Sequence, residues 1–227
     1  MLRIAADWGY LVAVPKIRMV REPKKLATYM PEEHFAAIYR ACEAARKPSE
    51  LPIQPPDCWR ALLTTAFMTG WRIGEILALR RDDLDLENGT AITRHDDNKG
   101  KRDELVPLHP LVVDHLRAIA CFEPVVFPWY HDRRSLWTEF YRIQKAAGIH
   151  LPCSGKHEHT DGCHYYGFHD CRRAFASLNA ENMSAEALQK LMRHQCYTTT
   201  QRYINLAGKL KPVVDKLHVP EVLRRAT

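Results

Sequence analysis

One short stretch of the chain, between Thr90 and Leu108, differs in its hydrophobic pattern from everything around it. Two apolar runs, residues 91–93 and 105–107, flank a polar segment at residues 96–102. This pattern predicts a β-hairpin with Lys99 in its turn. Most of the remaining chain carries apolar residues at helical spacing. The predicted fold class is therefore mainly α with a small antiparallel β-sheet (α+β).

Prolines, glycines and capping residues predict where the helices begin and end. The first opens at Pro31 and ends at Lys47-Pro48. The next starts at Asp57 and stops near Gly70, and a third follows from about Arg72 to Leu79. Further helices are expected at roughly 110–120, 134–147, 169–181, 184–193 with Ser184 as N-cap, and 198–206.

Composition limits the compartment and the kind of partner. The 227 residues carry a net charge of +6, which suits a polyanionic partner without identifying it. Seven cysteines, an odd number without a regular disulfide pattern, favour a reduced, cytoplasmic setting. No run reaches the roughly 18 apolar residues of a membrane helix, and no secretory leader is expected.

Side chains suited to phosphate chemistry recur along the chain in a fixed order. They are Arg72 in a T-G-x-R-x-x-E segment, Lys99 in the hairpin turn, His169 and Arg172 in an H-x-x-R box, His194 in an L-x-x-H box, and Tyr203. Any one of these short patterns arises by chance, but six in order do not. From about Leu26 to Tyr203 the chain resembles the tyrosine recombinase (phage integrase) family, and it is expected to share that family's catalytic-domain fold.

The two arginines match what cleavage of a DNA phosphodiester without a metal requires. Arg72 and Arg172 offer planar donors that stay charged and can stabilise a pentacoordinate phosphate. His169 precedes Arg172 by three residues, so a helix puts both on one face. The non-catalytic interpretation of Arg72 is a solvated ion pair with Glu75 on one helix.

The resemblance implies a role for each remaining residue. Tyr203 is the nucleophile, His169 assists removal of its proton, and His194 hydrogen-bonds a phosphate oxygen. Lys99 protonates the leaving 5′ oxygen, with Lys101 as the rival for this role. The implied enzyme is a site-specific recombinase or integrase that cleaves and rejoins DNA through a 3′-phosphotyrosyl intermediate, with no cofactor required for catalysis.

The resemblance also implies the organisation and the partners. Residues 1–25 correspond to a remnant of an N-terminal core-binding domain and a basic linker, 26–210 to the catalytic domain, and 211–227 to a tail. That tail either packs on a neighbouring subunit or docks on its own core. The expected partner is double-stranded DNA in the nucleoid, bound by a homo-tetramer, with a monomer when free. Alternatives are a non-catalytic DNA-binding remnant of a decayed integrase and a type IB topoisomerase-like enzyme.

Two positions depart from the family pattern. Arg193 stands where many relatives have glycine, and Cys171 stands inside the H-x-x-R box where leucine is common. Neither change removes a catalytic group. The bulky cation of Arg193 is expected either to assist DNA contact or to hinder helix packing.

A cluster of metal-binding residue types precedes the H-x-x-R helix. Cys153, His157, His159 and Cys163 could together hold a structural Zn²⁺. The spacing matches no standard zinc finger, and a polar histidine-rich loop that is merely solvated is the alternative. The family does not need metal for catalysis, so such an ion would pin the loop that delivers His169.

Overall fold

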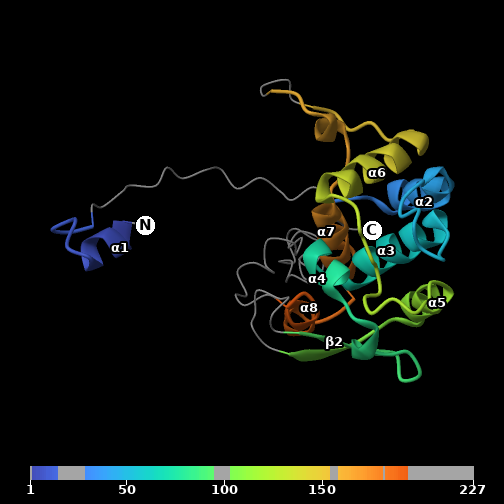
Figure 1. The fold of residues 1–227 in the computed structure, drawn as a ribbon, viewed down its shortest axis with the longest axis horizontal. Helices are drawn as coiled ribbons and strands as arrows, with labels where there is room; N and C mark the ends of the chain where they lie inside the picture. Colours follow the sequence, from blue (N-terminus) through green and yellow to red (C-terminus); the bar gives the residue numbers. More distant parts are fainter. Residues whose placement is uncertain (1, 15–28, 95–102, 154–157, 181, 194–227) are drawn as a thin grey trace, which may run out of the picture.

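The computed structural model describes residues 2–14, 29–94, 103–153, 158–180 and 182–193 (Figure 1). The helices in these ranges are α1 (Leu2–Asp7), α2 (Glu32–Arg40), α3 (Pro55–Thr69), α4 (Ile73–Ala78), α5 (Pro110–Ala118), α6 (Arg133–Ala146), α7 (Phe168–Asn179) and α8 (Ala185–Leu191). Short 3-10 turns are η1 (Ala41–Ala44), η2 (Arg81–Asp83) and η3 (Asp161–His164). No helix in these ranges is long and apolar enough to cross a membrane.

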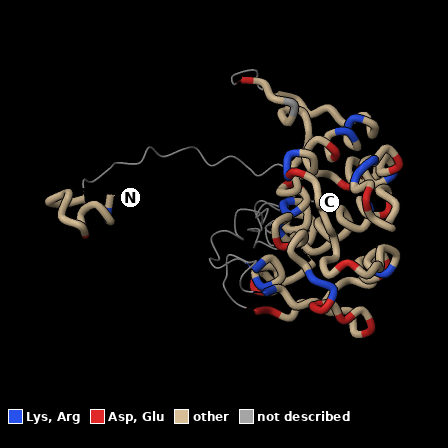
Figure 2. The backbone as a smooth tube through the Cα atoms, viewed as in Figure 1, with Lys and Arg blue, Asp and Glu red and all other residues tan. Residues whose placement is uncertain are grey.

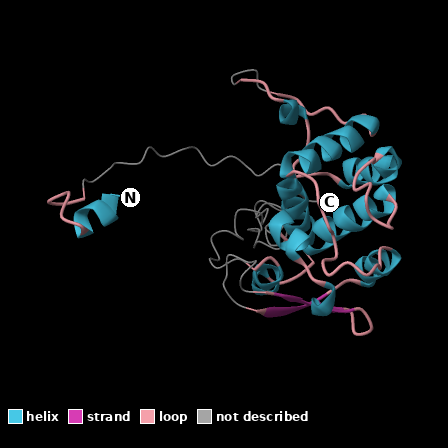
Figure 3. Cartoon of the chain, viewed as in Figure 1, coloured by secondary structure: helices cyan, strands magenta, loops and turns pink. Residues whose placement is uncertain are grey.

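The sheet has three short antiparallel strands in the order β1 (Leu84–Asp85), β2 (Thr90–Thr93) and β3 (Glu104–Pro107). Ala91 on β2 pairs with Val106 on β3, which confirms the predicted hairpin. The two residues of β1 are too few to produce a visible alternation in the sequence. Figure 3 shows how small the sheet is beside the helices, so the predicted mainly helical α+β class is confirmed.

Helix α3 is the central element of the core. It packs against α5 and α7, and Figure 1 shows the sheet and α6 at opposite ends of the described body. The predicted inward residues Trp59, Leu62, Leu63 and Ala66 are all buried. Phe67 was also predicted inward but is only partly buried, and its ring stacks on Phe35 of α2 at 4.1 Å between centroids.

An aromatic cluster joins three helices and fixes the start of α7. Trp59 of α3 stacks on Phe140 of α6 and Phe168 of α7, with centroid distances of 5.8 and 6.2 Å. Phe140 and Phe168 stack on each other at 4.7 Å. Large buried aromatic rings contribute strongly to packing energy. Because Phe168 is the first residue of α7, this cluster sets where the H-x-x-R segment begins.

One predicted helix end is several residues too late in the sequence. The helix that opens after Pro31 ends at Arg40 and continues only as η1, because the N–H groups of Arg46 and Lys47 donate to the Glu139 carboxylate on α6 instead of to a helix. The helix predicted over 184–193 ends at Leu191. This end and the ends of the other described helices agree with the prediction within a few residues, and the helix predicted over 198–206 lies outside the described residues.

Candidate active site

The segment before Arg72 is a tight turn built by three residues. The Thr69 hydroxyl donates to the Thr65 carbonyl (2.6 Å) and accepts from the Trp71 N–H (3.2 Å). Gly70 ends α3 in the left-handed conformation, with φ of 64°. A Cβ on Gly70 would lie 2.7 Å from Cδ1 of Phe175 on α7. The turn therefore needs glycine both for its backbone angle and for close packing of α7.

Arg72 is the N-cap of α4 and is tied to Glu75 in two ways. Its backbone N–H donates to the Glu75 carboxylate (2.8 Å), and its Nη1 donates to the other carboxylate oxygen (3.0 Å). The Glu75 side chain is only 4% exposed, whereas that of Arg72 is 31% exposed. The alternative interpretation of Arg72, an ion pair with Glu75, is therefore correct as to the contact, but the carboxylate of this pair is buried rather than solvated. Glu75 orients a guanidinium that keeps part of its surface open.

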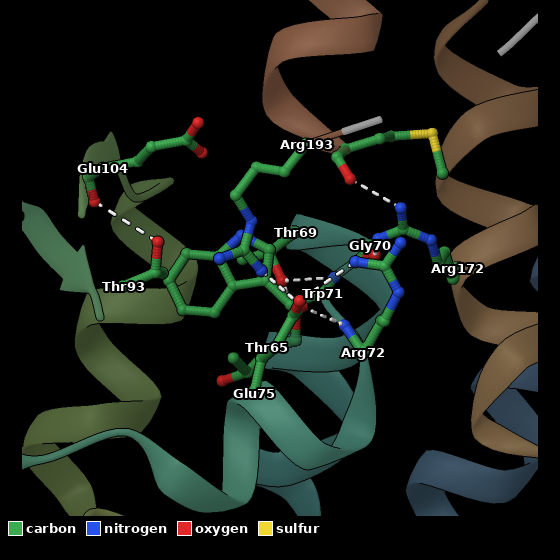
Figure 4. Close-up of polar contacts among 11 residues, drawn as sticks. Thr65, Thr69, Gly70, Trp71, Arg72, Glu75, Thr93, Glu104, Arg172 and Arg193 are labelled. Atoms are coloured by element: carbon green, nitrogen blue, oxygen red, sulfur yellow. Dashed lines mark hydrogen bonds and ion pairs between the residues drawn. The ribbon is translucent and has the colours of Figure 1, made fainter. Parts of the chain in front are cut away.

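Arg172 is the buried connection between three motif segments (Figure 4). This residue on α7 is 1% exposed. Its Nη1 donates to the carbonyl of Gly70, and its Nη2 donates to the carbonyl of Met192. Gly70 lies two residues before Arg72, and Met192 lies two residues before His194. One guanidinium thus holds together the ends of α3 and α8 beside its own helix.

His169 lies in the first turn of α7, where its side chain is exposed. Partial desolvation of the ring lowers its pKa below the ordinary value, and the cations Arg173 and Arg172 add to this effect. The charge of Arg72 acts in the same direction. Cations disfavour protonation of a nearby imidazole. The neutral form of His169, which can accept a proton, is therefore favoured beside the two motif arginines.

Arg193 adopts a backbone conformation that glycine accepts more easily than other residues. Its φ is 52°, in the left-handed region that penalises side chains with a Cβ. The guanidinium turns inward, forms an ion pair with Glu75 and lies 5.1 Å from the centre of the Trp71 ring. It therefore packs within the protein rather than hindering the packing of α8.

The burial of Arg193 is energetically costly. Its side chain is 5% exposed, and desolvation lowers the pKa of the guanidinium despite the nearby Glu75. Its Nε and Nη1 have no hydrogen-bond partner within the described ranges. The sequence analysis identified Arg193 as a departure from the family pattern. It could not show that Arg193 and Arg72 both form ion pairs with the buried carboxylate of Glu75.

Cys171, the second departure from the family pattern, is part of the core. It is fully buried, and burial raises the pKa of its thiol to about 12. A thiol with so high a pKa stays protonated and packs as a small apolar group. It therefore takes the place of leucine without adding chemistry to the site.

The other predicted catalytic residues, Lys99, His194 and Tyr203, lie outside the described residues. The same is true of Lys101. Figure 2 shows Lys and Arg segments spread over the described body and interleaved with Asp and Glu segments. The site is therefore identified from the arrangement of Arg72, His169 and Arg172.

Three of the four predicted metal ligands come together between α6 and α7. One ligand atom from each of Cys153, His159 and Cys163 lies within 4.8 Å of the other two. The fourth predicted ligand, His157, lies outside the described residues.

Comparison with known proteins agrees with this geometry. The family model described as "Phage integrase family" matches residues 28–209. Tyrosine recombinase XerA of Thermococcus kodakarensis is 26% identical over 177 residues, an alignment covering 72% of this chain and 57% of that protein. The chain thus spans less than two thirds of that relative's length.

Solved structures show the same fold. XerH site-specific recombinase bound to palindromic difH substrate, in a post-cleavage complex, matches with a TM-score of 0.60 and 19% identity, over 85% of this chain and 54% of that one. A lambda integrase tetramer bound to a Holliday junction matches with a TM-score of 0.60 and 18% identity, over 89% and 55%. Because the family model matches residues 28–209, which are most of its length, this chain belongs to the phage integrase family.

Proposed function

We propose that the chain is the catalytic domain of a site-specific DNA recombinase or integrase. It cleaves and rejoins DNA strands through a 3′-phosphotyrosyl intermediate, with Tyr203 as the nucleophile. The observation that carries this proposal is the buried guanidinium of Arg172, which is bonded to the carbonyls of Gly70 and Met192. Those bonds hold the turn before Arg72 and the end of α8 beside α7, the helix that carries His169.

The two arginines bind and stabilise the phosphate. Arg72 is partly exposed and oriented by Glu75, and Arg172 is fixed by two carbonyl oxygens. Donors held in place before the reaction stabilise developing charge without a cost of reorganisation. In this proposal Arg72 and Arg172 neutralise the non-bridging oxygens as the phosphorus becomes pentacoordinate.

The proton steps balance within the protein. The Tyr203 oxygen bonds to phosphorus while His169, neutral because of its lowered pKa, accepts the phenolic proton. The bond from phosphorus to the 5′ oxygen breaks, and Lys99 donates the proton that this oxygen needs. His194 donates to a phosphate oxygen. Rejoining reverses these steps, and no cofactor is needed because the phosphotyrosine keeps the energy of the original phosphodiester.

The proposed partner is double-stranded DNA, and the proposed working form is a homo-tetramer on it. Support comes from the two similar structures, one a recombinase with its DNA substrate and the other a tetramer on a Holliday junction. Mass photometry of the protein with and without a DNA substrate that forms covalent adducts tests the assembly. A complex that stays monomeric on cleavable DNA would contradict the tetramer.

Cleavage is tested by trapping the covalent adduct. The protein is incubated with sheared genomic DNA from its source, denatured in detergent, and recovered with any attached strands, which are then sequenced. Wild type is expected to carry strands joined at their 3′ ends, and Tyr203→Phe none, while both retain similar DNA affinity. Adducts that persist in Tyr203→Phe would contradict the nucleophile, and DNA binding by wild type without any adduct would favour a non-catalytic DNA-binding remnant.

The role of Arg172 has a matched test. Arg172→Lys keeps the charge but loses the planar group that reaches two carbonyls, so adduct formation is expected to fall by about 100-fold or more. Arg173→Lys is the control, because Arg173 is paired with Asp170 on the same helix and has no assigned contact with the phosphate. Equal losses in the two variants would show that Arg172 has no special position.

A further inference from the structure

The loop between α6 and α7 brings two cysteines and a histidine to one point. They are Cys153, at the end of one described range, and His159 and Cys163, in the next. The three ligand atoms are all within 4.8 Å of one another, and the Cys153 sulfur lies 3.7 Å from Nδ1 of His159. Both cysteines are thiols in the structure. None of these residues belongs to the proposed catalytic site.

We propose that Cys153, His159 and Cys163 bind a structural Zn²⁺ ion. With Zn–S bonds of about 2.3 Å and Zn–N bonds of about 2.0 Å, tetrahedral geometry separates a sulfur and a nitrogen ligand by about 3.5 Å. The observed separation of 3.7 Å between the Cys153 sulfur and Nδ1 of His159 is close to this value. The loop therefore holds these two groups at the spacing that the ion requires.

The chemistry of the ligands selects zinc. Two thiolates and an imidazole are soft and borderline donors, which favour Zn²⁺ over the oxygen-preferring Mg²⁺ and Ca²⁺. The Cys163 sulfur accepts the backbone N–H of Thr160 (3.1 Å), and the Thr160 hydroxyl lies 3.5 Å from the same sulfur. Such contacts support the negative charge of a metal-bound thiolate. A fourth donor completes the tetrahedron, and the proposal rests on the three described ligands.

The base of the loop is closed independently of the metal. The Leu151 N–H donates to the His164 carbonyl (2.9 Å), and Nδ1 of His164 hydrogen-bonds the Leu151 carbonyl (2.7 Å). The rings of His150 and His164 stack with centroids 4.1 Å apart. Cys153 and Cys163 lie just inside this closed base. The two thiols are therefore held near each other, which lowers the entropy cost of binding the ion.

The loop also packs on α6, so a metal in it would influence how the chain enters α7. Tyr141 of α6 stacks on Tyr165 with centroids 5.3 Å apart. A Cβ on Gly162 would lie 2.6 Å from the Tyr141 hydroxyl oxygen. Three residues after Tyr165, Phe168 begins α7, which carries His169 and Arg172. The proposed ion thus has a structural role and takes no part in the phosphoryl transfer.

Metal content tests the proposal directly. Protein purified without chelator or immobilised metal is expected to contain about one zinc per chain by elemental analysis, with Cys153 and Cys163 unmodified by mass spectrometry. Cys153→Ser and Cys163→Ser are expected to lose the zinc. Cys121→Ser is the control and is expected to keep it, because Cys121 lies outside the loop and accepts a hydrogen bond from Arg81.

A second measurement does not depend on a variant that folds. Wild-type protein stripped of metal and titrated with Co²⁺ is expected to show thiolate-to-cobalt charge-transfer absorption that saturates at one equivalent and is displaced by Zn²⁺. Absence of this absorption in reduced, folded protein would overturn the proposal. Two other results would also overturn it. One is a disulfide between Cys153 and Cys163 that persists in protein purified with a reducing agent, and the other is zinc retained by Cys163→Ser.

Discussion

Replacement of Arg193 by glycine and by alanine isolates the effect of its backbone conformation. Arg193 has φ of 52° at the end of α8, where a residue with a Cβ is strained. Both replacements remove the same guanidinium, with its Glu75 ion pair, its Trp71 contact and its two N–H groups that lack partners among the described residues. Those contributions cancel when the two variants are compared. Only the Cβ separates Arg193→Gly from Arg193→Ala.

The size of the difference follows from two opposing terms. The left-handed conformation costs a residue with a Cβ about 1–2 kcal/mol, which glycine avoids. Glycine in turn loses about 0.5–1 kcal/mol more than alanine through the entropy of its unfolded chain. The two ranges leave a net advantage for Arg193→Gly over Arg193→Ala of about 0–1.5 kcal/mol. In a chain of this size, 1 kcal/mol corresponds to about 2–4 °C in Tm.

Urea and thermal denaturation of the two purified variants measure this difference. The control pair is Lys190→Gly and Lys190→Ala, because Lys190 is exposed within α8. There the order should be reversed, with alanine more stable by about 0.5–1 kcal/mol. If Arg193→Ala is more stable than Arg193→Gly by about 0.5–1 kcal/mol, as expected for the Lys190 pair, the left-handed conformation does not strain this position and the reasoning is refuted.

Three further predictions concern the turn, the base and the acid. Gly70→Ala should destabilise the fold by about 2–4 kcal/mol in urea denaturation, because it adds a clash to an unfavourable φ, whereas Gly74→Ala on open α4 should be neutral or slightly stabilising. Wild-type cleavage should be lost as the pH falls through the lowered pKa of His169, and His169→Gln should remove that step from the pH–rate profile; an unchanged profile would exclude His169 as the base. Lys99→Ala should be rescued by DNA with sulfur at the 5′ bridging position, since a thiolate leaves without a proton, and rescue of Lys101→Ala instead would show that the assignment within the hairpin is wrong.

The sequence predicted the fold well where the signals were local. The period change at Thr90, the glycine that ends α3 and the serine that caps α8 each depend on nearby residues alone, and each was correct. The end of the α2 helix was predicted too late because Glu139, nearly 100 residues away, accepts the Arg46 and Lys47 N–H groups. Such a contact leaves no trace in local periodicity.

The same distinction applies to the site. The order of motif residues identified Arg72, His169 and Arg172 as one group, and the structure brings their segments together. The sequence did not predict that Arg172 bonds backbone carbonyls, because a carbonyl oxygen is present at every position and carries no residue-specific signal. It also did not predict that Arg72 and Arg193 both form ion pairs with Glu75. Arg193 follows α8 and lies more than 100 residues after Glu75, so local sequence patterns cannot show this contact.

The hydrogen bond from Arg172 to the Met192 carbonyl makes the orientation of the Arg172 guanidinium depend on the position of the end of α8. If Met192 moved away, the buried guanidinium would lose one of its acceptors, at a cost of about 1–3 kcal/mol or more for a charged group. By thermodynamic reciprocity, DNA that binds more tightly to the correctly oriented Arg172 must favour the docked position of Met192 by the same free energy. In the proposed mechanism, binding of the phosphate by Arg172 and docking of Met192 are thereby linked, so the substrate and the end of α8 would stabilise each other through this one guanidinium.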